Sequence, residues 1–228
     1  MASSVILALD CSTEFCSVAL LNGDVMTAKE IRADQRHSEL LLPMIDAVLI
    51  EGGIGLNQLS VIAFGAGPGS FTGLRIACGV AQGLAFGANI SVLPIPTLLA
   101  LAQASDHARV LAVLDARMGE VYVAAYERVD GPWSAVIEPC LCKPDAAPLL
   151  PEGAWTGVGS GFAAYADVLQ RQFGAQLTSV DASRFPQARY IAQLASERLL
   201  EALPAENAVP LYIRDKVAFT ERERGVGK

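Results

Sequence analysis

Residues 61–77 read VIAFGAGPGSFTGLRIA, and this stretch decides the fold. Its first four residues are an apolar run that predicts a buried β-strand. Residues 65–69 place three glycines and a proline in succession, which predicts a sharp bend with bare backbone. Ser70 predicts a helix N-cap, because its hydroxyl can accept from free N–H groups of the next turn. The sequence therefore predicts a strand, a glycine loop and a helix that runs to about Gly87.

The glycine loop allows two interpretations. Unpaired N–H groups at a helix N-terminus favour an anion, so a phosphate contact is one of them. However, no Lys-Ser or Lys-Thr follows the glycines, as a Walker A motif requires, and the glycine spacing does not match the dinucleotide-binding fingerprint. The pattern by itself favours a structural turn, and the phosphate contact stays open.

The predicted helix after Ser70 carries unusually small side chains. Two stripes at four-residue spacing contain almost only glycine and alanine: Gly69, Gly73, Ala77, Ala81 and Ala85, and beside them Gly79, Gly83 and Gly87. Glycine inside a helix costs up to about 1 kcal/mol relative to alanine. We therefore expect another helix or strand to approach this surface closely.

Composition limits the possible classes of protein. The 228 residues carry a net charge of −7, and 52% are hydrophobic. Such a chain can bury a large core, as one domain or as two lobes of roughly 100 residues each. The acidic balance argues against binding nucleic acid alone, because Lys and Arg supply most of that affinity. With no basic leader and no apolar span of about 18 residues, we expect a cytoplasmic protein.

Five cysteines lie at positions 11, 16, 78, 140 and 142. An odd number at scattered spacings favours free buried thiols over a disulfide framework. Cys140 and Cys142 lie too close together for the usual zinc-binding pair, and no second pair follows. No metal site is predicted.

The first half is predicted to begin with antiparallel strands at residues 5–9, 16–21 and 25–31. Asp10 follows the first strand, where open α/β sheets place ligands, although a turn-capping carboxylate is the simpler interpretation. Residues 36–49 have the spacing of an amphipathic helix, in which Pro43 predicts a late start or a kink. His37 is interpreted as a hydrogen-bonding residue at the helix start, because no further metal ligands lie near it.

The second half repeats these landmarks in the same order. A strand at residues 110–114 ends at Asp115 as the first strand ends at Asp10, and residues 155–162 lead through spaced glycines into a helix as residues 61–70 do. This pattern indicates an internal duplication. We place the lobe boundary at the polar break after residue 105, which gives lobes at 1–105 and 106–214 and a flexible tail at 215–228.

The remaining segments predict less distinctive elements. Residues 90–93 predict a strand followed by a helix at 98–104, and residues 131–153 predict an outer strand with loops. Two further helices are predicted at residues 163–173 and 190–203.

A duplicated α/β fold with an aspartate after the first strand of each lobe resembles the actin, sugar-kinase and Hsp70 ATPase superfamily. Several motifs narrow the resemblance to the bacterial TsaB (YeaZ) family. In order, they are Leu9-Asp10-Cys11-Ser12, His37-Ser38-Glu39 with Leu42-Pro43, residues 65–75, Leu114-Asp115-Ala116-Arg117, and Pro210-Leu211-Tyr212-Ile213-Arg214. They span almost the whole chain, so the resemblance implies a two-lobe α/β fold throughout.

The resemblance implies a non-catalytic subunit of the machinery that installs the threonylcarbamoyl group on the adenosine beside the tRNA anticodon. In that family the partner is the paralogue TsaD, which holds ATP and metal, and TsaE is an accessory ATPase. The resemblance implies that this chain binds no cofactor tightly, contacts tRNA only through the complex, and can also form a homodimer. TsaD-like relatives carry a second histidine four residues after the first, whereas Leu41 stands at that position here.

We expect the partner to contact the helices at residues 36–49 and 70–87, whose apolar stripes exceed what one sheet face needs. The residues predicted for this interface are Leu41, Met44, Ile45, Val48, Gly73, Ile76, Ala77 and Val80. The alternative is that both stripes are internal core, and the sequence does not show which of these residues are core and which contact a partner.

A competing hypothesis is an independent ATPase or kinase of the same superfamily, or a glycoprotease-like metalloenzyme. Asp10, Gly67, Gly69 and Asp115 would then line a nucleotide cleft, which the leading hypothesis treats as vestigial. Both glycine loops lack Lys and Arg, which leaves phosphate charge without a cationic partner. His37 and His107 are the two histidines, and no protease constellation can be assembled from them.

Overall fold

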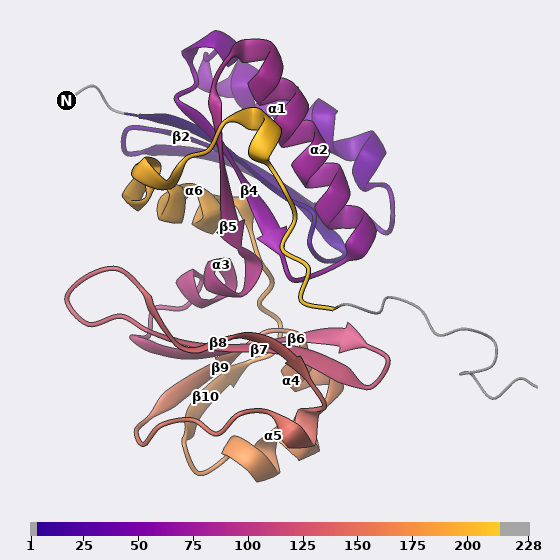
Figure 1. The fold of residues 1–228 in the computed structure, drawn as a ribbon, viewed down its shortest axis with the longest axis vertical. Coiled ribbons are helices and arrows are strands. Elements are labelled where there is room, and N and C mark those ends of the chain that lie inside the picture. The colour runs from indigo at the N-terminus through magenta and orange to yellow at the C-terminus, as the bar shows by residue number, and fades with distance from the viewer. Residues whose placement is uncertain (1–3, 215–228) are drawn as a thin grey trace, which may run out of the picture.

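The first lobe is built on a five-stranded sheet with the order β3-β2-β1-β4-β5 in the structure, a computed structural model that describes residues 4–214 (Figure 1). Its strands are β1 (Val5–Asp10), β2 (Phe15–Asn22), β3 (Val25–Arg32), β4 (Val61–Gly67) and β5 (Ser91–Pro96). The first three form an antiparallel meander, while β4 pairs in parallel with both β1 and β5.

The second lobe repeats this arrangement. Its sheet has the order β10-β9-β6-β7-β8, so each strand has a counterpart in the first sheet. The strands are β6 (Arg109–Arg117), β7 (Glu120–Glu127), β8 (Ser134–Cys142), β9 (Trp155–Val158) and β10 (Leu177–Asp181). Again the first three are antiparallel, and β9 pairs in parallel with β6 and β10. The prediction of a duplicated two-lobe α/β fold is confirmed.

Helices separate and cover the two sheets (Figure 1). The helices are α1 (His37–Gly52), α2 (Phe71–Ala88), α3 (Thr97–Gln103), α4 (Gly161–Ala164), α5 (Ala166–Phe173) and α6 (Ala188–Glu197), with short 3₁₀ turns at Leu56–Gln58, Pro144–Ala146, Leu199–Glu201 and Ala205–Asn207. One core lies between the first sheet and α1 and α2, a second surrounds α3 and α6 between the sheets, and a third lies between the second sheet and α4 and α5.

Several element boundaries differ from the predictions. β4 continues to Gly67 and β5 to Pro96, because pairing with neighbouring strands overrides the local turn signals. The helix predicted at 163–173 is interrupted at Tyr165, and the one predicted at 190–203 ends at Glu197. The late start predicted from Pro43 is also wrong, since α1 begins at His37 and continues through the proline.

The end of the described chain returns to the first lobe. α6 packs against β1, β2 and β4, and Leu203 exchanges backbone hydrogen bonds of 2.8 Å with Val92 of β5. The boundary near residue 105 separates the two sheets in sequence, but residues after 187 help to build the first lobe. The tail predicted at 215–228 lies outside the described residues.

Within residues 4–214, no helix combines the length and the apolar character needed to cross a membrane.

Candidate functional site

Asp10 lies at the end of β1, where the resemblance places the ancestral cleft. Its side chain is fully buried, and Oδ1 accepts hydrogen bonds from the Ser12 backbone N–H (3.0 Å) and the Ser12 hydroxyl (2.8 Å). Oδ2 has no hydrogen-bond partner among the described residues. A Cβ built on Gly65 would overlap this oxygen and lie 3.3 Å from Ile191 of α6. Burial raises the pKa of Asp10 to about 7, so this carboxyl is half-protonated near neutral pH.

The start of α2 packs directly on the turn that follows Asp10. Cβ atoms built on Gly69 and Gly73 would overlap the carbonyl oxygens of Ser12 and Cys11. The Ser70 backbone N–H donates to the Ser12 carbonyl at 2.7 Å, and the Ser70 hydroxyl accepts from the Gly73 N–H at 3.3 Å. Ser70 is therefore the N-cap that the sequence predicts, and these N–H groups are satisfied within the chain.

The C-terminal segment closes the other side of the glycine loop. The Leu211 N–H donates to the Ala66 carbonyl at 2.7 Å, and a Cβ on Gly67 would lie 2.6 Å from the Leu211 carbonyl oxygen. Arg75 of α2 donates from Nε to the Tyr212 hydroxyl at 2.9 Å. The loop is thus held between the Ser12 turn and the Leu211 segment, which supports its interpretation as a structural turn.

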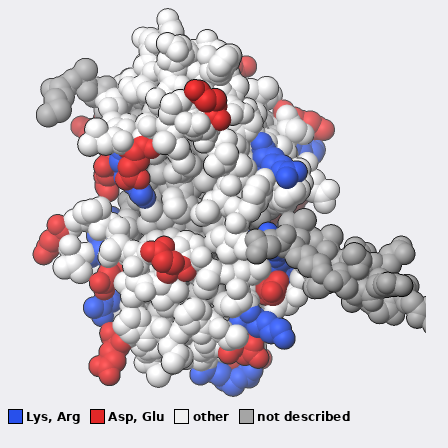
Figure 2. Space-filling view, viewed as in Figure 1, with Lys and Arg blue, Asp and Glu red and all other residues white. Residues whose placement is uncertain are grey.

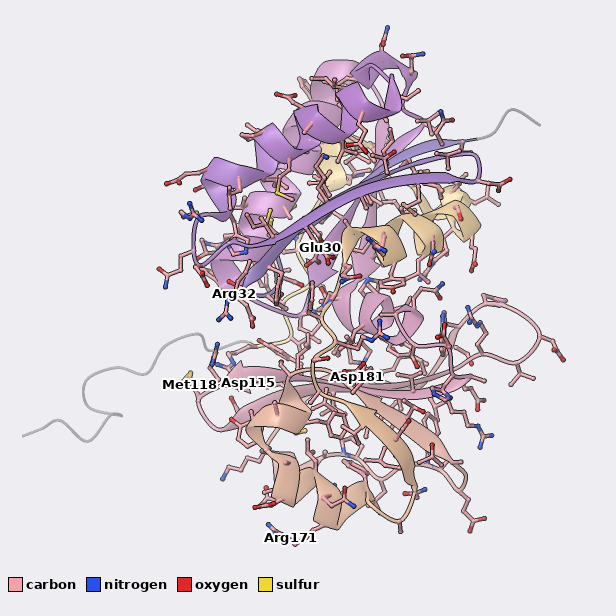
Figure 3. The ribbon with its side chains drawn as sticks, turned by 180° about the vertical axis from the view of Figure 1, so that it is seen from behind. Glu30, Arg32, Asp115, Met118, Arg171 and Asp181 are labelled. Atoms are coloured by element: carbon pink, nitrogen blue, oxygen red, sulfur yellow. The ribbon has the colours of Figure 1, made fainter. Side chains whose placement is uncertain are left out.

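Asp115, the counterpart of Asp10, lies at the end of β6 near the boundary between the lobes (Figure 3). Its Oδ1 accepts from the Arg117 backbone N–H at 2.9 Å, and its Oδ2 pairs with the Arg117 guanidinium at 3.1 Å. The Tyr165 hydroxyl donates to Oδ1 at 3.4 Å. Both oxygens of this carboxylate therefore have partners, which are Arg117 in the same turn and Tyr165.

Several of the groups predicted to line a nucleotide cleft are engaged by contacts within the chain. Asp10 is sealed under α6 and Gly65, while Gly67 and Gly69 are in contact with backbone of the same chain. Phosphate binding requires cationic or unpaired N–H partners. No Lys or Arg lies in the glycine loop, and the Gly67 N–H donates to the Thr97 hydroxyl at 3.0 Å.

The histidines lie in separate places. His37 is buried at the start of α1, where Nε2 lies 3.2 Å from the Phe15 carbonyl oxygen, as expected for a hydrogen-bonding residue. His107 lines a hollow of about 140 Å³ beside the lobe boundary, in which Arg184 pairs with Asp181 at 2.9 Å. Across residues 4–214, no three His, Cys, Asp or Glu side chains are grouped as a metal site.

The residues predicted for the partner interface divide into two sets. Leu41, Ile45, Val48, Gly73 and Ala77 are buried in the core under α1 and α2. Met44, Ile76 and Val80 are half-buried and pack against that core. The buried five are therefore core positions, as the alternative interpretation of the two stripes expects, and the other three lie near the surface.

A different part of α2 is exposed and has no close neighbour among the described residues. A Cβ built on Gly79, Gly83 or Gly87 would meet no atom within 4 Å. Phe86 follows on the same face with 75% of its surface exposed. We call these four residues the glycine face. Arg75 is the one charged residue among the 18 of α2, and Figure 2 shows few charged side chains over α1 and α2.

The predicted interface omitted the most exposed apolar residues of α1 and α2. Phe86 lies on α2, and Ile50 on the neighbouring α1 is 80% exposed. Leu42 and Phe71 are also exposed. The three glycines of the glycine face form a stripe already noted in the sequence, but the predicted interface did not include them. A helix face that is exposed and yet carries almost no charge is the signal that should have added them, because an exposed helix face is normally polar.

Comparisons with known proteins agree with this architecture. The family model described as "TsaD: tRNA N6-adenosine threonylcarbamoyltransferase" matches residues 30–221. The chain is 40% identical to the "tRNA threonylcarbamoyladenosine biosynthesis protein TsaB" of Haemophilus influenzae, over 96% of this chain and 97% of the relative. The chain belongs to the TsaB (YeaZ) family. The TsaB protein of Escherichia coli is 37% identical over 94% of this chain and 96% of its own length.

The solved structures extend the family relationship to the fold. YeaZ from Pseudomonas aeruginosa superposes with a TM-score of 0.86 at 38% identity, covering 92% of this chain and 99% of that one. The two-lobe arrangement is therefore that of the TsaB (YeaZ) family over nearly the full chain. Since the transferase model also matches most of the chain, the family shares an ancestry with TsaD proteins.

Proposed function

We propose that this chain is a non-catalytic subunit of the machinery that forms the threonylcarbamoyl group on the adenosine next to the tRNA anticodon. It acts in the cytoplasm by binding and activating a TsaD-type paralogue through the surface of α1 and α2. The paralogue holds ATP and metal, and a TsaE-type ATPase and tRNA join through the assembly. The names of the TsaB relatives support the pathway.

The observation that carries the docking proposal is the glycine face. Each glycine inside a helix costs up to about 1 kcal/mol relative to alanine. Among residues 4–214, Gly79, Gly83 and Gly87 meet nothing that requires their small size. Close approach by a helix of another molecule would explain why these positions are glycine, because glycine lets two backbones come near each other. The half-buried Met44, Ile76 and Val80 lie at the surface of the same two helices.

The paralogue is the expected occupant of this surface. Duplicated families commonly pair related surfaces, and the model of the transferase matches residues 30–221, a range that includes both helices. The exposed Phe86 and Ile50 supply apolar area of the kind that anchors interfaces. In the absence of the paralogue, the same face pairs with a second copy of the chain, so the homodimer and the complex compete.

The lack of catalysis rests on the closed cleft. Asp10 is buried beneath Gly65 and Ile191, and Leu211 covers Gly67. A catalytic carboxylate must reach its substrate within hydrogen-bonding distance. We therefore infer that this chain binds no nucleotide or metal tightly and contributes to the reaction through its partner. The net charge of −7 fits a subunit that does not hold tRNA itself.

The test is a complementation experiment with tRNA nucleoside analysis. A bacterium depleted of its own TsaB is supplied with wild-type chain, with Gly83→Leu, or with Gln170→Leu, which adds the same side chain at an exposed position on α5. We expect threonylcarbamoyladenosine to return with the wild type and Gln170→Leu but not with Gly83→Leu. Failure of the wild type refutes the pathway, and rescue by Gly83→Leu refutes the docking face.

A further inference from the structure

The turn between β1 and β2 brings two cysteines together. Asp10 and Ser17 form the last pair of the antiparallel ladder, so Cys11 and Cys16 occupy the next opposing positions. Their sulfur atoms lie 3.8 Å apart, and both residues are fully buried. The sequence predicts free thiols at both positions, since a spacing of five residues does not reveal that they face each other.

The backbone geometry suits a disulfide between these residues. Directly opposed residues of an antiparallel pair have Cα atoms about 4.5–5.5 Å apart. A disulfide requires a Cα separation of roughly 4.4–6.8 Å and an S–S bond of about 2.05 Å. The two sulfur atoms therefore need to approach each other by less than about 2 Å.

The two thiols are chemically unequal. The hydrogen bond between them lowers the pKa of Cys16 against the opposing effects of burial and the Asp10 carboxyl, and the same bond together with burial raises the pKa of Cys11. Of the two thiols, Cys16 is therefore the more readily ionised. A thiolate is the reactive form toward peroxides, and a neighbouring thiol resolves the product.

We propose that Cys11 and Cys16 form a reversible dithiol–disulfide pair that is oxidised by hydroperoxides. The Cys16 thiolate attacks one peroxide oxygen, the O–O bond breaks, and hydroxide leaves. The Cys11 sulfur then attacks the sulfenic acid of Cys16, forming the S–S bond and releasing water that carries the Cys11 proton. In total, two thiols and one hydrogen peroxide give one disulfide and two waters. A dithiol reductant reverses the reaction by thiol–disulfide exchange.

The other cysteines are arranged differently: Cys140 and Cys142 also interact through their thiols, but they are neighbours on one strand and do not face each other across a turn. Cys78 is buried without a neighbouring thiol. Cys140 and Cys142 lie two residues apart on β8, a spacing of roughly 6.5–7 Å along an extended strand. Burial raises the pKa of Cys140, and burial with the neighbouring thiol raises that of Cys142 to about 11. Both residues are more exposed than Cys11 and Cys16.

Disulfide formation would reach the start of α2. The Cys11 carbonyl oxygen packs on Gly73, and the adjacent Ser12 carbonyl accepts from the Ser70 N–H at 2.7 Å. Moving Cys11 toward Cys16 therefore shifts the contact that seats the first turn of α2. This second step rests on the proposed function, because α2 carries the docking face. We expect oxidation to weaken binding of the TsaD-type paralogue.

The first experiment maps the disulfide in the full chain. The reduced protein is treated with hydrogen peroxide, remaining thiols are alkylated, and tryptic peptides are weighed. Cys11 and Cys16 share one peptide, since Lys29 is the first basic residue. We expect that peptide to lose two hydrogen masses, carry no alkyl group, and regain both thiols with dithiothreitol. Alkylation of both cysteines, or oxygen on one of them alone, overturns the proposal.

Two variants separate the pair from general oxidation. In Cys11→Ala, Cys16 has no resolving thiol, so we expect oxygen to accumulate on Cys16 instead of a disulfide. In Cys78→Ala, the disulfide forms as in the wild type. A protein that oxidises identically with and without Cys11 contradicts the assignment.

A binding assay then tests the coupling to α2. The reduced chain, the oxidised chain and Cys11→Ala are each titrated with the paralogue. Loss of affinity on oxidation in the wild type but not in Cys11→Ala is the expected result. Equal affinity of the reduced and oxidised wild type refutes the coupling, whereas failure of the reduced chain to bind refutes the proposed function and leaves the mapped disulfide unaffected.

Discussion

The two ends of the glycine pattern on α2 have opposite surroundings. At the start of the helix, Gly69 and Gly73 touch the backbone of Ser12 and Cys11, and a single added carbon would overlap it. Further along, the glycine face is open, and an added carbon on Gly83 would meet nothing within 4 Å. At the start of the helix, glycine is thus required by packing against the turn after β1. Further along, no described residue requires it.

This difference separates the glycines that the lobe itself needs from the glycines that we propose a partner needs. The packed end buries Asp10 and holds the glycine loop against the Ser12 turn. The open end keeps a helix that would be more stable with alanine. Each of the following changes tests one side of the contrast, from the largest expected effect to the smallest.

Asp10→Asn tests whether the packed end is sealed from water. Because the folded-state pKa is raised from 3.8 to about 7, the folded protein binds the extra proton more tightly than the unfolded chain. This contribution is fully present below pH 4 and is lost as the pH rises through 7, by on the order of 4 kcal/mol. We expect denaturant unfolding of the wild type, relative to Asp10→Asn, to show this loss.

Asp24→Asn is the matched control, since Asp24 is exposed in the β2–β3 turn. It should leave the pH dependence of the free energy of unfolding unchanged. If Asp10→Asn and the wild type have parallel stability curves between pH 4 and 8, the carboxyl is in contact with solvent and the closed cleft is wrong.

Gly73→Ala tests the tight contact directly. The new methyl group overlaps the Cys11 carbonyl oxygen, which is backbone and cannot rotate away. We expect a loss of about 3 kcal/mol in the free energy of unfolding, as for severe overpacking. Thermal unfolding followed by circular dichroism measures it, and a variant as stable as the wild type contradicts the contact.

Gly83→Ala is the same substitution on the open side. Within residues 4–214 nothing lies near the new methyl group, so we expect only helix propensity to change. We expect the isolated protein to become more stable by up to about 1 kcal/mol. A destabilised Gly83→Ala monomer would mean that the face packs within the chain and that the contrast with Gly73 is false.

Tyr212→Phe tests the segment that covers the glycine loop. The change removes the hydrogen bond from Arg75 but keeps the ring, whose centroid lies 5.7 Å from that of Phe71. We expect a loss of only about 0.5–1 kcal/mol, because the bond is exposed. Faster amide exchange of the Leu211 N–H, relative to the wild type, should accompany it. Unchanged exchange would show that the segment is held without this bond.

Much of the fold follows from the sequence because its landmarks are local. Asp10 and Asp115 each end an apolar strand, and glycines follow the matching later strand in both halves. These signals depend on neighbouring residues alone. The placement of α6 could not be predicted in this way, since an amphipathic helix indicates that one face is buried but not which sheet covers it.

The site was harder to predict for a related reason. Leu41 and Ile45 are buried, whereas Leu42 is exposed, although all three are apolar residues of α1. Without a polar face to mark the exterior, hydrophobic pattern alone cannot separate core from docking surface. The structure separates the two for each glycine, because it shows whether an added side chain would collide with neighbouring atoms.

The most direct test is the affinity of the purified chain for the TsaD-type paralogue, measured by calorimetry for the wild type, Gly83→Leu and Gln170→Leu. Leucine on the glycine face should hold the helices apart and weaken binding at least about tenfold, equivalent to about 1.4 kcal/mol. Gln170→Leu should bind as the wild type does. Equal affinity of all three proteins would contradict docking through the glycine face.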